Sequence, residues 1–120
     1  MEEKNYQLKN KERQDHRLKK NRQFSYIFRK GERFSTRNFN LFIIDSKYKN
    51  YKIGYSISKK EGKANKRNLL KRRMKEIVRI NRLPSNNHNY ILQAKNSATE
   101  LDYKEIENQL IKVFEKAKLK

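Results

Sequence analysis

A net charge of +19 on 120 residues is the property that most limits what this chain can fold into. It has 32 lysine and arginine residues and only 13 acidic ones, so most of the positive charge has no partner within the chain. An excess of this size repels itself in a compact protein, and it favours a chain whose usual partner is a polyanion. Nucleic acid is the leading candidate, because basic side chains release its bound counterions. An anionic membrane is the next candidate, and an acidic protein is the last.

The composition excludes several classes of protein. The chain has no cysteine, which excludes disulfides, thiolate catalysis and cysteine metal sites. It has no run of about 18 apolar residues, the length that spans a bilayer, and its charged N-terminus does not look like a secretory signal. We therefore expect a cytoplasmic protein, and a chain of this length suits one domain with one modest core.

The N-terminal part of the chain divides into two regions. Residues 1–16 are polar and show no apolar periodicity, so we predict a flexible charged tail there and a folded domain over residues 17–120. A short helix then follows. Its candidate cap is Asn21, its end is Gly31, and its aromatic face has the i, i+3, i+4 spacing of Phe24, Ile27 and Phe28.

Two segments in the middle of the chain have the character of strands. Residues 39–45 are rich in aromatic and β-branched side chains, and residues 51–57 alternate between apolar and polar side chains, which is typical of a half-buried strand. Residues 46–50 between them are polar and turn-like. We therefore predict an antiparallel hairpin, with a further short strand at residues 33–36.

The second half of the chain has two helical patterns with a strand between them. Residues 64–81 have an apolar stripe at helical spacing, and residues 89–95 form a candidate strand with Tyr90, Leu92 and Ala94 on one side. Asp102 or Thr99 could cap a final helix with the apolar stripe Ile106, Leu110, Val113, Phe114 and Ala117. The predicted order is helix, two or three strands, helix, strand, helix. This order indicates an α+β fold with helices packed on one sheet.

The positive charge is concentrated in two regions of the chain. Residues 17–38 contain eight basic residues and one acidic residue, and residues 59–79 contain ten and two. Residues 100–120, in contrast, contain five of each sign. The last helix therefore has the mixed surface of an ordinary solvated helix, whereas residues 59–79 do not.

The helix predicted at residues 64–81 concentrates its charge on one face. Residues four apart lie on the same side of a helix. Like charges at that spacing destabilise an isolated helix by about 0.2–0.5 kcal/mol per pair. A contact surface for sugar–phosphate backbones explains such an arrangement better than a solubility surface does, because Arg and Lys donors fix a protein's position on phosphates. The face consists of Arg67, Asn68, Lys71, Arg72, Lys75 and Arg79.

Several of these residues belong to a pattern that resembles the bacterial ribonuclease P protein component. The pattern is Ser56-Ile57-Ser58-Lys59-Lys60, then Gly62-Lys63-Ala64, then Arg67-Asn68 and Lys71-Arg72. The opening Arg17-Leu18-Lys19-Lys20, with Phe24, Phe28 and Gly31, is also similar to that family. The resemblance covers residues 17–118.

The resemblance implies a fold and a division of labour. The fold is a sheet of about four strands packed against helices, in the order α-β-β-β-α-β-α, with an unusual left-handed crossover at the basic helix. For any parallel βαβ unit, general rules alone predict a right-handed crossover. The family's catalyst is a large RNA that holds the metal ions. The protein subunit binds that RNA and the 5′ leader of precursor transfer RNA, so magnesium is expected with the RNA and no cofactor on the protein's own side chains.

The resemblance also assigns roles to individual positions of this chain. The residues that match the motif facing the catalytic RNA are Lys63, Arg67, Asn68, Lys71, Arg72 and Lys75. Those that match the cleft for the leader are Phe24, Phe28 and Phe42, with Lys59 and Lys60 at its edge. Lys75 stands where the family usually has arginine, which keeps the charge and loses the planar fork.

The residues themselves leave alternatives open. Phe24, Phe28 and Phe42 are either core residues or platforms on which unpaired bases stack. His16 and His88 have no second ligand at metal spacing and are expected to be exposed, and no paired carboxylates indicate two-metal hydrolysis. The competing functions are a structural or ribosomal RNA-binding protein, then a DNA-binding protein, and last a nuclease that acts without RNA.

Overall fold

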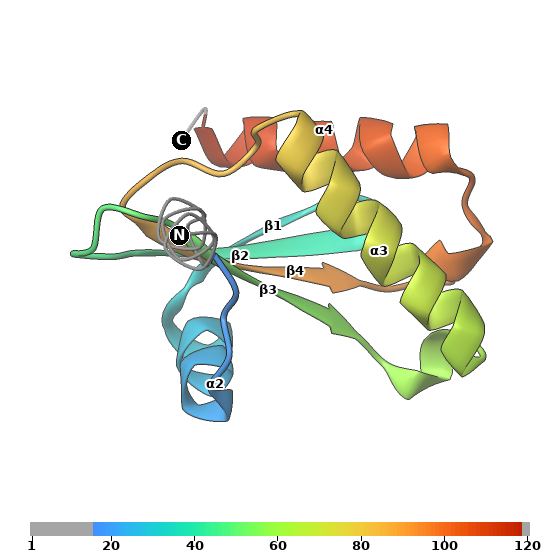
Figure 1. The fold of residues 1–120 in the computed structure, drawn as a ribbon, viewed down its shortest axis with the longest axis horizontal. Coiled ribbons are helices and arrows are strands. Elements are labelled where there is room, and N and C mark those ends of the chain that lie inside the picture. Colours follow the sequence, from blue (N-terminus) through green and yellow to red (C-terminus); the bar gives the residue numbers. More distant parts are fainter. Residues whose placement is uncertain (1–15, 119–120) are drawn as a thin grey trace, which may run out of the picture.

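In the computed structural model, which describes residues 16–118, four strands form one sheet with helices on both faces (Figure 1). The expected α+β fold and the order α-β-β-β-α-β-α are confirmed. The elements are α2 (Asn21–Lys30), β1 (Glu32–Ser35), β2 (Phe39–Asp45), β3 (Lys52–Ile57), α3 (Ala64–Ile80), β4 (His88–Ala94) and α4 (Tyr103–Lys118). Two 3-10 turns, η1 (Lys59–Glu61) and η2 (Ala98–Glu100), precede α3 and α4. Except for His16, the predicted tail lies outside the described residues.

The strand order is β1-β2-β4-β3, so the predicted hairpin of β2 and β3 is wrong. β4 lies between them, antiparallel to β2 and parallel to β3. The physical reason is burial: Tyr90, Ile91 and Leu92 of β4 are all at most 2% exposed, so both faces of this strand are covered and it belongs in the centre. The turn-like residues 46–50 indicate that the chain reverses, but they do not determine which strand becomes the neighbour.

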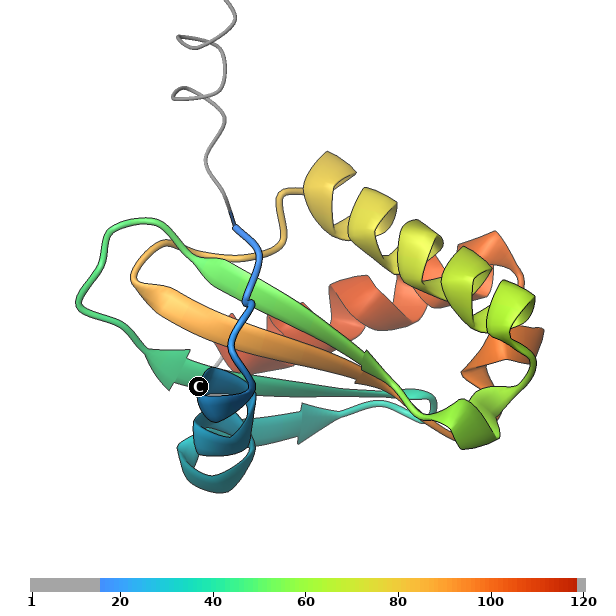
Figure 2. The ribbon, with the colours of Figure 1, turned by 60° about the horizontal axis from the view of Figure 1, so that its bottom comes forward.

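The connection from β3 through α3 to β4 is left-handed. Figure 2 views the sheet from the α2 side, with β3 and β4 running in the same direction, and the two core clusters place α3 on the opposite face. Seen instead from the α3 side with the strands pointing upward, β4 lies to the left of β3. This confirms the crossover that the family resemblance implies, against the general preference for right-handed connections.

The main core lies between the sheet and the two long helices. α3 contributes Leu70, Met74, Ile77 and Val78, as its apolar stripe predicts. α4 contributes Ile106, Leu110, Val113 and Phe114 from its own predicted stripe, and Asp102 caps this helix by accepting a 2.8 Å hydrogen bond from the Glu105 N–H. Burying one such side chain contributes about 1.5–3 kcal/mol, so this layer supplies most of the stability of the fold.

Within residues 16–118, α2 is the one helix on the opposite face of the sheet, over a small cluster of Leu18, Ile27 and Ile91. The predicted cap at Asn21 is wrong: Asn21 is the first helical residue, and Lys20 before it makes no side-chain capping bond. Gly31 ends the helix as expected, but its φ of −74° is not left-handed. A Cβ at Gly31 would lie 2.7 Å from the Ile27 carbonyl oxygen, so glycine is needed there for close packing.

The segment before α2 pairs with the free edge of β3. The Ile53 N–H donates to the His16 carbonyl oxygen at 2.7 Å, and the Leu18 N–H donates to the Ile53 carbonyl oxygen at 3.1 Å. The His16 ring stacks on Tyr51 with 3.8 Å between centroids. His16 is therefore half-buried rather than exposed, and packing against the sheet begins one residue before the predicted domain boundary.

Candidate nucleic-acid interface

The two flanks of α3 differ in their charges. On the flank next to α4, Lys66 pairs with Glu100 at 3.5 Å and the Tyr103 hydroxyl donates to Glu76 at 2.9 Å. The acidic side chains near this helix are therefore held on the α4 side. The other flank, toward the edge of β3, has none of them and carries the predicted cations.

We call this second flank the basic face of α3, and the structure brings the predicted residues together on it. All of them are exposed except Arg67, which is half-buried, and Arg72 lies at the border with the α4 side, near Glu76 and Tyr103. Within residues 16–118, no acidic side chain forms an ion pair with any of these cations. The residues of this face are Arg67, Asn68, Lys71, Arg72, Lys75 and Arg79.

Lys75 shows how closely the positive charges are gathered. Its Nζ atom lies 5.9 Å from the centroid of the Tyr55 ring on β3. Burial lowers the pKa of the Lys75 ammonium below its usual value, and the neighbouring charges of Lys71 and Arg17 lower it further. Because Arg17 belongs to the segment that pairs with β3, the fold joins the two basic regions seen in the sequence along one edge of the sheet.

Arg67, at the first turn of α3, has a hydrogen-bond donor that the described chain does not satisfy. Its Nε atom is buried and has no partner among residues 16–118. Leaving such a donor unpaired costs about 1–3 kcal/mol, and because the atom is buried, an acceptor from outside could pair with it only after the Arg67 side chain moves. A phosphate oxygen is an acceptor of the right kind, because arginine binds phosphate through its planar set of N–H groups.

The turn between β3 and α3 is fixed in place and presents three further lysines. The Ser58 hydroxyl accepts from the Lys60 N–H at 3.2 Å, and the Thr99 hydroxyl donates to the Glu61 carbonyl oxygen at 2.6 Å. Gly62 has a φ of +131°, which only glycine adopts readily. The side chains of Lys59, Lys60 and Lys63 are exposed around this anchored turn.

Phe24, Phe28 and Phe42, which we call the aromatic cluster, meet on the α2 face of the sheet. The rings of Phe28 and Phe42 are in edge-to-face contact at 4.9 Å and 76°. The Phe24 ring lies over Gly54, where a Cβ would come within 2.3 Å of it. All three rings are half-buried and pack on the small α2-side cluster, so they support the fold and also keep exposed surface.

Beside the aromatic cluster lies a row of polar side chains that the sequence reasoning missed. The Ser35 hydroxyl donates to Asn40 Oδ1 at 2.6 Å, and Asn40 Nδ2 donates to Gln93 Oε1 at 2.9 Å. Ser56 of β3 is next to Gln93 in register, so the row crosses all four strands. Figure 2 shows that α2 does not cover this half of the sheet. The only local signal was Asn40 within an apolar strand, since strand pairing alone assembles the row.

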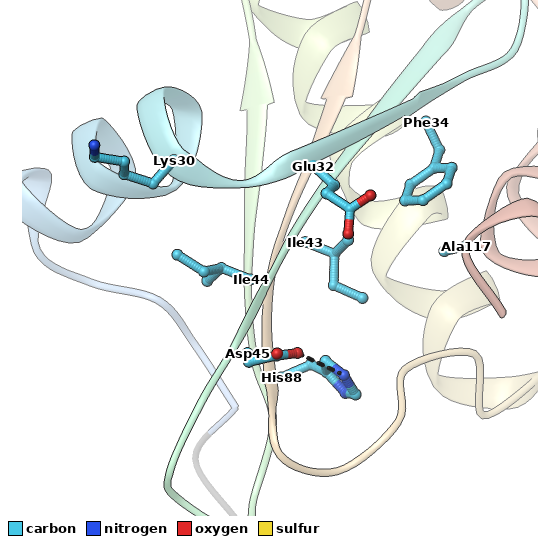
Figure 3. A pocket seen from close by; sticks show the side chains of 8 residues that line it. All are labelled: Lys30, Glu32, Phe34, Ile43, Ile44, Asp45, His88 and Ala117. Atoms are coloured by element: carbon cyan, nitrogen blue, oxygen red, sulfur yellow. Dashed lines mark ion pairs between the residues drawn. The ribbon is translucent and has the colours of Figure 1, made fainter. Parts of the chain in front are cut away.

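The lining of a hollow at the other end of the sheet includes one histidine and two carboxylate side chains (Figure 3). His88 Nε2 lies 3.3 Å from Asp45 Oδ1, and Glu32 lines the same hollow. Nevertheless, among residues 16–118 no group of three or more His, Asp or Glu side chains is placed to hold a metal ion. His88 lies at the start of β4 and is half-buried, rather than exposed as predicted.

The fold and the basic face of α3 define a small protein that binds a polyanion. None of the helices within residues 16–118 is long and apolar enough to cross a membrane. The family described as Ribonuclease P matches residues 13–118, and the chain belongs to that family.

Individual relatives agree with this assignment. The ribonuclease P protein component of Clostridium botulinum (strain 657) is 34% identical over 105 residues, which cover 86% of this chain and 95% of that protein. The corresponding protein of Finegoldia magna is 36% identical over 102 residues, which cover 84% of this chain and 89% of that protein. A solved structure of the Staphylococcus aureus RNase P protein superposes with a TM-score of 0.81 at 30% identity. The match covers 88% of this chain and 97% of that one. The chain is thus a protein subunit of the endoribonuclease that matures the 5′ end of transfer RNA.

Proposed function

We propose that this subunit binds two RNAs through two separate surfaces and that one of these RNAs, not the protein, carries out the cleavage. The basic face of α3, with Lys63, binds the catalytic RNA. The aromatic cluster, with Lys59 and Lys60 at its edge, binds the single-stranded 5′ leader of precursor transfer RNA. The catalytic RNA cleaves the phosphodiester bond and holds the magnesium ions, and the complex works in the cytoplasm.

The observation that carries this proposal is the position of the two surfaces on opposite faces of the sheet. α3 packs on one face and α2 on the other, while β3 and the η1 turn form the edge between them. Arg17 and Lys75 lie close together along that edge. One small domain can therefore contact a folded RNA with its basic face and still leave the α2 face open for a second strand.

The physical effect of such a bridge is to lower the cost of bringing two polyanions together. Lysine and arginine side chains replace the counterions that would otherwise screen the two RNAs, so binding weakens steeply as salt rises. Each leader base stacked on an aromatic ring adds about 1–3 kcal/mol. The subunit should therefore tighten substrate binding and reduce the magnesium concentration that cleavage requires.

The polar row extends this proposed leader site. Asn40 is only 8% exposed, and both ends of its amide are engaged, by Ser35 and by Gln93. The half-buried amide of Gln93 is therefore the group of this pair that can reach the edge of an unpaired base. A stacked base on Phe42 would lie next to these amides, because Asn40 and Phe42 are on the same face of β2. The row thus supports binding of single-stranded rather than paired RNA.

The experiment is a cleavage assay on precursor transfer RNA at low magnesium with a bacterial catalytic RNA. We expect the full chain to stimulate cleavage, and we expect no cleavage by the protein without RNA. Arg67→Ala should weaken binding of the catalytic RNA, whereas Phe24→Ala should weaken binding only of substrates that carry a leader. If stimulation is absent while tight RNA binding persists, the chain is a structural RNA-binding protein instead.

A further inference from the structure

A second aromatic and cationic hollow lies on the other flank of α2, away from the aromatic cluster. It has a volume of about 580 Å³ and is bounded by α2, the end of β2 and the loop that follows β2. Within α2, Phe24 and Phe28 project to one side of the buried Ile27, and Tyr26 projects to the other. The hollow is therefore distinct from the proposed leader site, although both use the same helix.

Two tyrosines line this hollow with their rings in solvent. Tyr26 is 49% exposed and Tyr48 is 67% exposed, and they are two of the four large hydrophobic side chains that are exposed within residues 16–118. Ile44, which is half-buried, lines the hollow between them. Aromatic rings on an open apolar floor can stack on any nucleobase, because every base has a π-face.

The loop that carries Tyr48 is held in place by the chain itself. The Tyr48 N–H donates to the Ser46 hydroxyl at 3.2 Å, and Asn87 Nδ2 donates to the Tyr48 carbonyl oxygen at 3.1 Å. Backbone hydrogen bonds between Asn87 and both Ser46 and Lys49 join the same two loops. Binding a ligand at Tyr48 would consequently require little ordering of the loop.

The charges around the hollow suit a phosphate backbone. Arg22 and Arg29 line it from α2, and Lys47 lines it from the loop, with its Nζ atom 5.8 Å from the Tyr48 ring centroid. Asp45 is the one acidic side chain that lines the hollow; it is 97% exposed and lies 3.3 Å from His88, and the three cations outnumber it. Single-stranded nucleic acid binds to sites that combine cations, which contact the phosphates, with exposed aromatic rings, which stack on the bases.

We infer that this hollow is a second site for unpaired RNA, in which one or two bases stack on Tyr26 and Tyr48 while Arg22, Arg29 and Lys47 contact the phosphates. The inference rests on the RNA-binding role of the chain, but it does not depend on the leader site on the other flank of α2. The unpaired strand belongs either to the precursor or to the catalytic RNA, and the two sources are separated by experiment.

The test uses the full chain with Tyr48→Trp as a fluorescent reporter, since the protein has no tryptophan of its own. Addition of a single-stranded oligouridine should quench this fluorescence in a saturable way. Adding Tyr26→Ala should raise the dissociation constant about 5- to 150-fold, the range expected for one lost stacking contact, whereas Tyr26→Phe should leave it unchanged. Lys112→Trp, on the exposed side of α4, is the matched control and should not be quenched.

Three results would overturn the inference: no quenching of Tyr48→Trp, equal quenching by inorganic polyphosphate, or a dissociation constant that does not respond to Tyr26→Ala. Repeating the titration with catalytic RNA, with precursor transfer RNA, and with transfer RNA lacking a leader identifies which RNA enters the hollow. The cleavage assay is a separate readout. Loss of stimulation with quenching intact would count against the proposed function only, and the opposite pair of results would count against the second site only.

Discussion

The two faces of the sheet are built for different purposes. On the face of α3 and α4, 16 buried residues form one continuous core, whereas on the face of α2 only three buried residues form a separate cluster. On the second face the aromatic cluster is half-buried, and no helix of the part of the chain that the structure describes covers the polar row. One face is thus filled by the chain itself, and the other has apolar and hydrogen-bonding groups still available to a partner.

This difference shows how a small basic protein can be stable and still offer a large binding surface. The stabilising layer carries almost no function of its own, because its side chains are inaccessible. The charged side chains lie around it on α3, η1 and the start of α2. Binding residues can therefore change their contacts without loss of the core, and the following predictions test that separation.

The largest expected effect is on stability, from a substitution on the filled face. Phe39→Ala removes a ring that is fully buried against α3 and α4, and it should lower the free energy of unfolding by about 3–5 kcal/mol. Phe28→Ala, the matched change on the α2 face, should lower it by less because that ring is half-buried. Denaturant unfolding measures both free-energy changes. Equal losses would show that a ring on the α2 face stabilises the fold as much as a ring in the core of the other face.

The next effect is on RNA affinity, from the basic face of α3. Arg67→Ala should weaken binding of the catalytic RNA about 10- to 150-fold, since charge-assisted hydrogen bonds contribute about 1.5–3 kcal/mol. It should also reduce the slope of affinity against salt by about one. Filter binding over a range of salt concentrations measures both quantities. Lys112→Ala on the exposed side of α4 is the control, and an equal loss there would mean that binding follows net charge alone.

A smaller effect is expected where α2 meets the sheet. Gly54→Ala would place a Cβ 2.3 Å from the end of the Phe24 ring, so the ring must move. We expect a loss of about 1–3 kcal/mol from overpacking and weaker binding of a leader oligonucleotide, with catalytic-RNA binding unchanged. Thermal unfolding and fluorescence anisotropy provide the measurements. Ser56→Ala, on the same face of β3, should have a smaller effect on stability than Gly54→Ala.

The smallest effect concerns the pKa of Lys75. In the free protein, burial together with the charges of Lys71 and Arg17 lowers this pKa, so Arg17→Ala should raise it by removing one repulsion. A bound polyanion favours the ammonium form, so the pKa should rise on binding, with uptake of protons. The affinity therefore decreases as pH increases from the pKa of the free protein to the higher pKa of the complex. Nuclear magnetic resonance of the lysine side chains can follow the pKa of Lys75. A fall in this pKa on adding heparin, a polyanion, would contradict the prediction.

The sequence by itself determined the elements and the chemistry of the binding face. The apolar spacing in α3 and α4 and the alternation in β3 are local patterns, and a helix or strand forms largely according to such patterns. The cations of α3 are four residues apart and so share one face whatever the tertiary fold. The motif at residues 56–72 was sufficient to indicate the family.

Only the tertiary structure decided what lies next to what. β4 enters between β2 and β3, Arg17 comes close to Lys75, and Ser35, Asn40 and Gln93 join into one row. The hollow beside Tyr26 and Tyr48 also forms only when α2 lies on the sheet. Apart from the hydrogen bond between Ser35 and Asn40, which are five residues apart, these contacts join residues that are far apart in the chain. The free energy that selects among such pairings comes from burial of the whole core rather than from any local pattern.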